Sequence, residues 1–173
     1  MRRLLLGVAA GAVCLAASGC AVLDQTSDNV EKDFSGTYSV AAQSRAASHQ
    51  MTSAQISFDR NGQQLSSATV RLAGPGVPEG WTLKKCGDPG AFVTSNFAIA
   101  DDPSKLEMVV CSNQQPVEDF PVVYLIRSKD GSPIDYSFPT LDFENHRIHA
   151  DSGRVMVIKW NPVSSSSYAL QPG

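Results

Sequence analysis

"QISFDRNGQQLSSATVRL", residues 55–72, carries the strongest secondary-structure signal of this 173-residue chain. Ile56 and Phe58 alternate with polar residues before Asn61-Gly62, a dipeptide that favours the two-residue turn of a β-hairpin. Beyond the turn, the apolar residues of "ATVRL" again alternate with polar ones. The stretch therefore predicts two antiparallel strands, each with one buried face and one face in contact with water.

Short strands and turns of the same kind continue on both sides of this hairpin. We expect further strands in "FSGTYSVAA", "WTLKKC", "AFVTSNFAIA", "KLEMVVC", "FPVVYLIRS", "PIDYSF", "LDFENHRIHA" and "RVMVIKW". "FPVVYLIRS" is apolar on both faces, which predicts a central position in the sheet. "PIDYSF" is expected to pair back onto it, and "LDFENHRIHA" is expected to form the last hairpin with "RVMVIKW".

About eight or nine short strands, without a long amphipathic helix, predict an all-β fold. Such a run fits either a single antiparallel β-sandwich or an up-and-down barrel. The β domain is expected to cover residues 34–163, after a leader of residues 1–19 and a lipidated cysteine with a flexible tether in residues 20–33. The Ser-rich residues 164–173 are expected to form a frayed tail or an edge strand.

The N-terminus has the layout of an export signal. Arg2 and Arg3 precede an uncharged apolar run, residues 4–17, which is shorter than the roughly 20 residues needed to cross a bilayer. Small residues then lead directly into Cys20. The leader therefore predicts export, and the position of Cys20 raises the question of how the exported protein is held.

"LAASGC", residues 15–20, resembles the lipobox of bacterial lipoproteins, in which small residues precede an obligatory cysteine. The resemblance implies that the Cys20 thiol accepts a diacylglyceryl group and that a peptidase then cuts before it. Acyl chains such as palmitate would hold the protein on a membrane, because two or more chains give a stable anchor. An ordinary cleaved signal is the alternative, and Cys14, inside the apolar run, is the poorer lipidation candidate.

The resemblance also implies a place in the bacterial cell envelope. Ala21 and Val22 follow Cys20, without the Asp that resembles an inner-membrane retention signal in enteric lipoproteins. If the cell has two membranes, the outer membrane is the expected destination. The oxidising compartment outside the cytoplasm then permits one disulfide between Cys86 and Cys111, the two remaining cysteines of the mature chain.

The charge of the mature chain excludes some partner classes. Without the two arginines of the leader, it has 12 basic and 17 acidic residues, a net charge of −5. No basic block occurs, so nucleic acid and anionic membrane surfaces are poor partners. The sequence contains no cofactor motif, and we expect none to be bound.

The stretch "ENHRIHAD" contains the residues that come closest to a metal or catalytic site. Glu144, His146 and His149 are weak metal candidates, because on a helix the two histidines would share a face. On the strand that the flanking pattern favours, they point to opposite faces, and a third firm ligand is missing. No Gly-x-Ser-x-Gly elbow marks a serine nucleophile. We therefore expect a protein that is not an enzyme.

The loop "GPGVPEGW" is the candidate binding element. Its prolines reduce the entropy lost on ordering, so it can present Trp81 and Val77 in a fixed geometry. The favoured alternative is that Trp81 packs in the core, as large aromatic residues usually do.

These observations lead to a functional hypothesis with two alternatives. The first of the three, and the main hypothesis, is an envelope lipoprotein whose β domain binds or inhibits another envelope protein. The second is a carrier of a small apolar ligand in a lipocalin-like barrel, since "FSGTY" resembles the Gly-x-Trp opening of lipocalins with Tyr38 in place of Trp. The third is a metal-dependent or hydrolytic enzyme that uses His146 and His149.

Overall fold

The computed structural model describes residues 32–61, 64–87, 103–113, 120–137 and 143–173. The elements, in chain order, are β1 (Gly36–Gln43), β2 (Ser53–Asn61), β3 (Gln64–Ala73), β4 (Gly80–Leu83), β5 (Lys85–Gly87), η1 (Pro103–Lys105), β6 (Leu106–Ser112), β7 (Val122–Ser128), β8 (Ile134–Ser137), α3 (Phe143–His146), β9 (Arg147–Ala150), β10 (Arg154–Asn161) and β11 (Ser164–Pro172). The all-β prediction is confirmed. No helix in the described ranges is long and apolar enough to cross a membrane.

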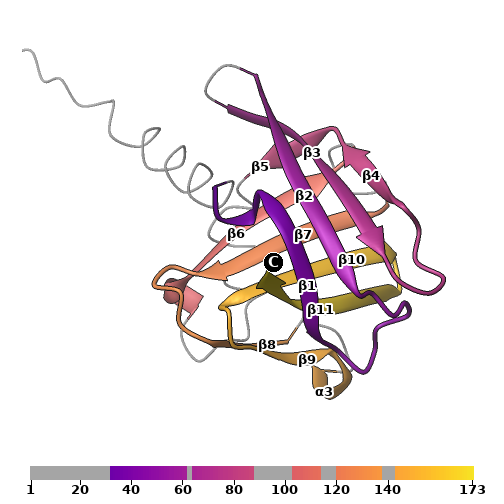
Figure 1. Ribbon diagram of the computed structural model, residues 1–173, viewed down its shortest axis with the longest axis vertical. Helices are drawn as coiled ribbons and strands as arrows, with labels where there is room; N and C mark the ends of the chain where they lie inside the picture. Colours follow the sequence, from indigo (N-terminus) through magenta and orange to yellow (C-terminus); the bar gives the residue numbers. More distant parts are fainter. Residues whose placement is uncertain (1–31, 62–63, 88–102, 114–119, 138–142) are drawn as a thin grey trace, which may run out of the picture.

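Within the described ranges, nine strands form one antiparallel sheet that almost closes on itself (Figure 1). The strand order is β4-β3-β2-β1-β11-β10-β7-β6-β5. β4 and β5 stand at opposite edges of this order, yet only Lys84 separates them in the chain. β5 also lies against β3, so the β4–β5 run joins the two edges. Of the two predicted architectures, the structure has the up-and-down barrel.

The hairpin predicted from residues 55–72 is confirmed. β2 pairs with β3 in a continuous antiparallel register from Ser53↔Ala73 to Asn61↔Gln64, with one irregularity near Asp59. The alternation of the sequence directs one face of both strands into the barrel. The apolar residues of that face are buried: Ala54, Ile56, Ala68, Val70 and Leu72.

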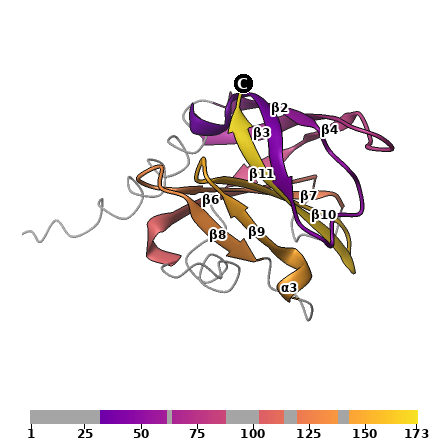
Figure 2. The ribbon, with the colours of Figure 1, turned by 60° about the horizontal axis from the view of Figure 1, so that its bottom comes forward.

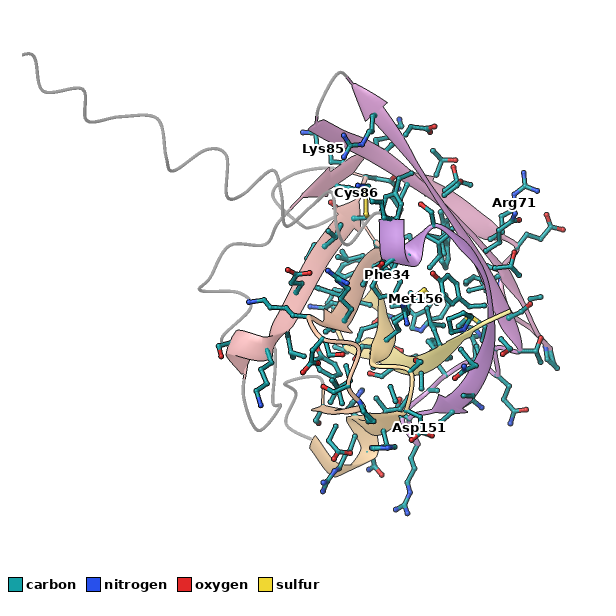
Figure 3. The ribbon with its side chains drawn as sticks, turned by 60° about the vertical axis from the view of Figure 1, so that its left-hand side comes forward. Phe34, Arg71, Lys85, Cys86, Asp151 and Met156 are labelled. Carbon is teal, nitrogen blue, oxygen red and sulfur yellow. A yellow bond between two sulfur atoms is a disulfide. The ribbon has the colours of Figure 1, made fainter. Side chains whose placement is uncertain are left out.

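Alternate residues of the barrel strands fill the interior with one apolar cluster. Two of its members, Phe34 and Met156, lie inside the barrel in Figure 3. The buried members are Phe34, Tyr38, Met51, Ala54, Ile56, Ala68, Val70, Leu72, Leu83, Val109, Cys111, Val123, Leu125, Met156, Ile158, Tyr168 and Leu170. These large side chains fill the barrel interior, as side chains fill the core of an ordinary globular protein.

A second apolar cluster lies on the outside of one wall. The hairpin β8–β9 crosses the outer face of β7 and β10, as a separate layer in Figure 2. β7 is consequently buried on both faces, which confirms its predicted central position. The cluster contains Leu106, Met108, Val122, Tyr124, Ile126, Ile134, Tyr136, Ile148, Ala150, Val155, Val157 and Ala169.

Two predicted strand pairings are wrong for the same reason. β8 pairs with β9 and not with β7, and β9 does not pair with β10. β7 and β10 pair with each other to continue the barrel wall, so the segment between them leaves the sheet and packs on top of it. The start of the predicted strand "LDFENHRIHA" is also wrong, because residues 143–146 form α3.

The prediction for the Ser-rich C-terminal residues is also wrong. Residues 164–172 are neither frayed nor at an edge, because β11 pairs with β10 on one side and with β1 on the other. Ser165, Ser166 and Ser167 are buried. Ser166 Oγ accepts a bond from Trp160 Nε1 at 2.9 Å, and Ser44 Oγ accepts one from the backbone N of Ser167 at 3.1 Å. The polar composition therefore hides a central strand.

The N-terminal boundary also moves. Residues 32–34 are helical and belong to the domain, whereas residue 33 was expected to end a tether. Phe34 is fully buried and its ring lies 6.2 Å from that of Tyr38. Asp33 forms an ion pair with Arg127, and its carbonyl oxygen accepts a bond from Arg154 Nε. The leader, Cys14 and Cys20 lie outside the described residues.

The disulfide between Cys86 and Cys111 is confirmed. The two residues face each other directly across the β5–β6 ladder. The bond therefore pins the end of the β4–β5 run, the part of the chain that joins the two edges of the sheet.

Replacing both Cys86 and Cys111 with Ala is expected to lower the free energy of unfolding by about 3.5 kcal/mol, because the unfolded chain regains the entropy of the closed loop. Urea denaturation of the oxidised protein and of this double variant measures the difference. Reduced wild type should behave like the double variant. Equal stability of oxidised and reduced protein would contradict the prediction.

Replacing Phe34 with Ala is expected to lower the free energy of unfolding by about 3–5 kcal/mol, because a fully buried ring leaves a cavity at one end of the barrel. The same urea titration measures it. The matched control is Val163→Ala, at a side chain that is 95% exposed, which should change stability by less than about 0.5 kcal/mol. Similar effects of the two changes would show that residue 34 is not part of the core.

Candidate interaction surface at the barrel mouth

The two ends of the barrel are built differently. Residues 32–34 lie at one end, and at the other end three connections meet: residues 44–52, 74–79 and 162–163 (Figure 1). We call this second end the aromatic mouth. Its defining residues are His49, Val77, Trp81, Trp160 and Val163.

Trp160, at the end of β10, is the centre of the aromatic mouth. The His49 ring lies 4.4 Å from it and the Trp81 ring 5.5 Å from it, both edge to face. This geometry is favourable because the positive edge of one ring meets the negative face of the other. Tyr168 supports the group from inside the barrel, since its hydroxyl donates to the carbonyl oxygen of His49 at 3.1 Å.

The predicted binding residues, Trp81 and Val77, both belong to this mouth. Each is partly buried and packs against the interior cluster, so the expected core packing of Trp81 is present together with partial exposure. The loop that carries Val77 is held by a bond from Val77 N to the Gly74 carbonyl and by one from Leu72 N to the Glu79 carbonyl. Its two prolines restrict the backbone further.

The sequence reasoning missed three residues of the mouth: His49, Trp160 and Val163. His49 lies in a small-residue stretch and Trp160 at the end of a predicted strand, so neither stood out. The usable signal was "WNPV", an aromatic residue directly before a Pro-containing turn. Val163, in that turn, is 95% exposed.

The candidate metal residues do not converge. His146 ends α3 and is buried, whereas His149 is exposed on β9. Glu144 is not the strand neighbour of His146 that the sequence suggested, because both belong to the short helix, and the side chain of Glu144 lies outside the described residues. Across the described ranges, no group of three or more His, Cys, Asp or Glu side chains could hold a metal ion.

His149 bridges two carboxylates instead. Its Nδ1 lies 3.0 Å from Asp135 Oδ1 on β8, and its Nε2 lies 3.1 Å from Asp151 Oδ1 in the following turn. A neutral imidazole carries one N–H and can donate to only one of them, whereas the protonated ring donates to both. The hydrogen bonds to Asp135 and then Asp151 therefore raise the pKa of His149 above its usual 6.5.

His146 has one noteworthy neighbour, Ser165, whose Oγ lies 3.5 Å from its Nδ1. A serine nucleophile needs a base at hydrogen-bond distance, and it must also be open to substrate. Both side chains here are buried. The pair therefore resembles a structural contact between α3 and β11 more than a catalytic one.

The filled barrel interior is relevant to the alternative that the protein carries a small apolar ligand. Its largest side chains, among them Phe34, Leu83, Met156 and Tyr168, are less than 2% exposed and pack against one another. An apolar ligand would need an apolar cavity of several hundred Å³. The interior positions of the described strands are occupied by side chains of the protein itself.

No protein-family model matches this sequence, and the comparisons with curated proteins and with solved structures also find no match.

Replacing Asp151 with Asn is expected to lower the pKa of His149 toward 6.5, because one of its two acceptors loses its charge. In wild type the folded state favours the protonated ring, so this contribution to stability is present in full below pH 6.5 and is lost as the pH rises through the higher pKa of the folded protein. Proton NMR titration of the His149 ring measures the pKa directly.

The control for this titration is Asp130→Asn, at an exposed carboxylate that hydrogen-bonds to Ser132 and not to His149. It should leave the His149 pKa unchanged. An unchanged pKa in Asp151→Asn would show that the two carboxylates do not act on the ring in solution.

Proposed function

We propose that this protein is an envelope lipoprotein, held on a membrane by lipid on Cys20, whose barrel binds another protein through the aromatic mouth. The observation that carries the proposal is the partly exposed group of His49, Trp81 and Trp160 at one end of a filled barrel. Binding energy at protein interfaces is concentrated in a few residues of this type, Trp above all.

The shape of the mouth supports a protein partner. Its rings are held by one another and by Tyr168, and its loop 74–79 is restrained by two prolines. Little conformational entropy is then lost when a partner docks. Val163, 95% exposed in the turn between β10 and β11, adds apolar area that would become buried in a complex.

The direction of the chain supports the same function. Residues 32–34 enter the barrel at the end opposite the mouth (Figure 1). Cys20 precedes Lys32 by 12 residues, and a flexible chain of that length would span about 20 Å. Lipid on Cys20 would therefore lie near the Phe34 end, and the mouth would face away from the membrane toward partners in the aqueous compartment.

The two alternatives receive less support. A carrier of a small apolar ligand predicts a cavity inside the barrel, where Tyr168, Met156 and their neighbours pack. A metal enzyme or hydrolase predicts that His146 and His149 converge with other polar groups, whereas one is buried and the other is exposed.

A photo-crosslinking amino acid at position 163 tests the protein-binding function in intact cells that make the full-length protein. Because Val163 is 95% exposed, the substitution should not disturb the fold. We expect a discrete protein adduct on irradiation, detected by its mass on a denaturing gel and identified by mass spectrometry. The matched control carries the same amino acid at position 130, an exposed turn residue at the other end of the barrel.

The adduct should be absent from the control and should decrease when Trp160 or His49 is changed to Ala in the position-163 background. Absence of an adduct at position 163, or an equal adduct at both positions, would refute binding through the mouth.

The lipid anchor is tested separately. Cells fed an alkyne analogue of palmitate should label the wild-type protein, because the resemblance of "LAASGC" to a lipobox implies lipid on Cys20. Cys20→Ser is expected to abolish the label and to release the protein from the membrane fraction. Cys14→Ser is the matched control and should keep both. Labelling that depends on Cys14 instead would overturn the assignment.

A further inference from the structure

One edge of β4 is unpaired. β4 stands at the end of the strand order of the large sheet and pairs with β3 along its first edge. In the described part of the chain, no backbone hydrogen bond joins its second edge to another segment. Lys84 carries the chain directly into β5, which pairs with β6 and not with β4. The backbone of β4 is therefore open on one side.

The backbone groups on this open side belong to Gly80 and Thr82. Leu72 N donates to the Glu79 carbonyl oxygen at 2.8 Å, which marks this pair as a hydrogen-bonded one. Hydrogen-bonded and non-hydrogen-bonded pairs alternate along an antiparallel ladder, so Trp81 bonds to β3, whereas Gly80 and Thr82 do not. Their N–H and C=O groups consequently point away from β3.

The side-chain spacing agrees with this assignment. Thr69 faces Thr82 across the ladder, and their hydroxyl oxygens lie 3.2 Å apart. A Cβ on Gly80 would lie 2.7 Å from the Cα of Arg71, its partner on β3. Non-hydrogen-bonded pairs bring the two strands and their side chains closest together. Both pairs are thus of the kind that leaves the backbone groups free for another strand.

The inner face of β4 is apolar. Trp81 and Leu83 direct their side chains inward, opposite Val70 and Ala68 of β3. Trp81 is nevertheless partly exposed, as expected at an edge that no described strand covers. Its ring lies 5.5 Å from that of Trp160 in the aromatic mouth. An apolar side chain on the inner face of an added strand would be buried against these rings.

The charges beside this edge are mostly positive. Lys84 and Lys85 follow β4 directly and are exposed, and Arg71 faces Gly80 from β3. Arg71 and Lys85 lie on the outside of the barrel in Figure 3. Within the described ranges, none of these three cations belongs to an ion pair. Glu79 is the one acidic residue between Arg71 and Lys85, so the edge favours a strand that carries carboxylates.

A second copy of this chain is a poor occupant of the edge. Pairing between two β4 edges would bring Lys84 and Lys85 of one copy close to the same lysines of the other, and like charges repel. Lysines at an exposed edge oppose such self-pairing in natural β proteins. The charges therefore favour a different protein with an acidic strand.

We propose that the free edge of β4 pairs with an extended strand of the protein partner. That strand carries an apolar side chain toward Trp81 and an acidic residue toward Lys84. The inference rests on the proposed function and names the kind of partner that the mouth binds. Main-chain hydrogen bonds to Gly80 and Thr82 supply affinity, and the apolar inner face and the cations supply selectivity.

A photo-crosslinking amino acid at position 82 tests the contact in intact cells that make the full-length protein. Thr82 is exposed, and its replacement keeps the backbone N–H. We expect an adduct with the same protein that position 163 captures. The matched control is position 55, because Gln55 is exposed on the same barrel wall but β2 is paired on both edges. It should give no adduct.

Thr82→Pro tests the backbone hydrogen bond itself. It removes an N–H that the β3–β4 ladder does not use, and proline is tolerated at such edge positions. In the position-163 background it should lower the adduct yield at least about fivefold, because a backbone bond to the added strand is lost. Thr82→Ala keeps the N–H and should leave the yield within about twofold.

Reversal of charge tests the acidic character of the strand. Lys84→Glu combined with Lys85→Glu should lower the position-163 adduct at least about threefold, because carboxylates then face carboxylates. Arg147→Glu, at an exposed residue of β9, is the matched control and should leave the adduct unchanged.

The outcomes separate this inference from the proposed function. An adduct at position 163 that needs Trp160 but is unchanged by Thr82→Pro would overturn strand addition and leave binding through the mouth intact. Equal adducts at positions 82 and 55 would overturn strand addition too. If Thr82→Pro does not fold, the comparison of positions 82 and 55 decides. Absence of an adduct at both 82 and 163 would overturn strand addition and the proposed function together.

Discussion

The closure of the sheet by the β4–β5 run is the constraint on which the rest of the structure depends. An open sheet leaves unpaired backbone groups along both edges. Here β4 pairs with β3, β5 pairs with β6, and Lys84 alone separates them, so one short run of chain belongs to both edges. The disulfide between Cys86 and Cys111 holds the β6 side of this junction. Once the sheet curls round, every second residue has to fill an enclosed interior.

Closure also gives the barrel two ends with different chemistry. One end is filled by Phe34 and secured by the ion pair of Asp33 with Arg127. The other collects aromatic rings from loops that are far apart in the sequence. Our proposals follow this polarity: a lipid anchor on the Phe34 side, and a binding surface at the mouth that faces away from the membrane.

The wall formed by β7 and β10 packs against apolar side chains on both of its faces. Its inner face belongs to the interior cluster and its outer face to a second cluster under β8–β9. Burial on both faces explains why β7 is apolar from Val122 to Ile126. The apolar outer face of this wall also lets the hairpin β8–β9 pack without joining the sheet. His149 on β9 links Asp135 on β8 to Asp151 in the turn after β9.

The sequence by itself determined most of the strands and which of their faces are buried, because an alternating or doubly apolar pattern directly records burial on one face or on two. That pattern predicted the hairpin of residues 55–72 and the central position of β7. The pairing of Cys86 with Cys111 followed separately, from the export signal and from the count of two cysteines in the mature chain. Only the tertiary structure decided which strands are partners. Periodicity carries no record of the neighbour, so β8 was assigned to β7, and the serines of β11 were taken for a tail or an edge although the strand is paired on both sides. The aromatic mouth was predicted only in part, through Trp81 and Val77, for the same reason: His49, Trp81 and Trp160 meet only because the barrel closes.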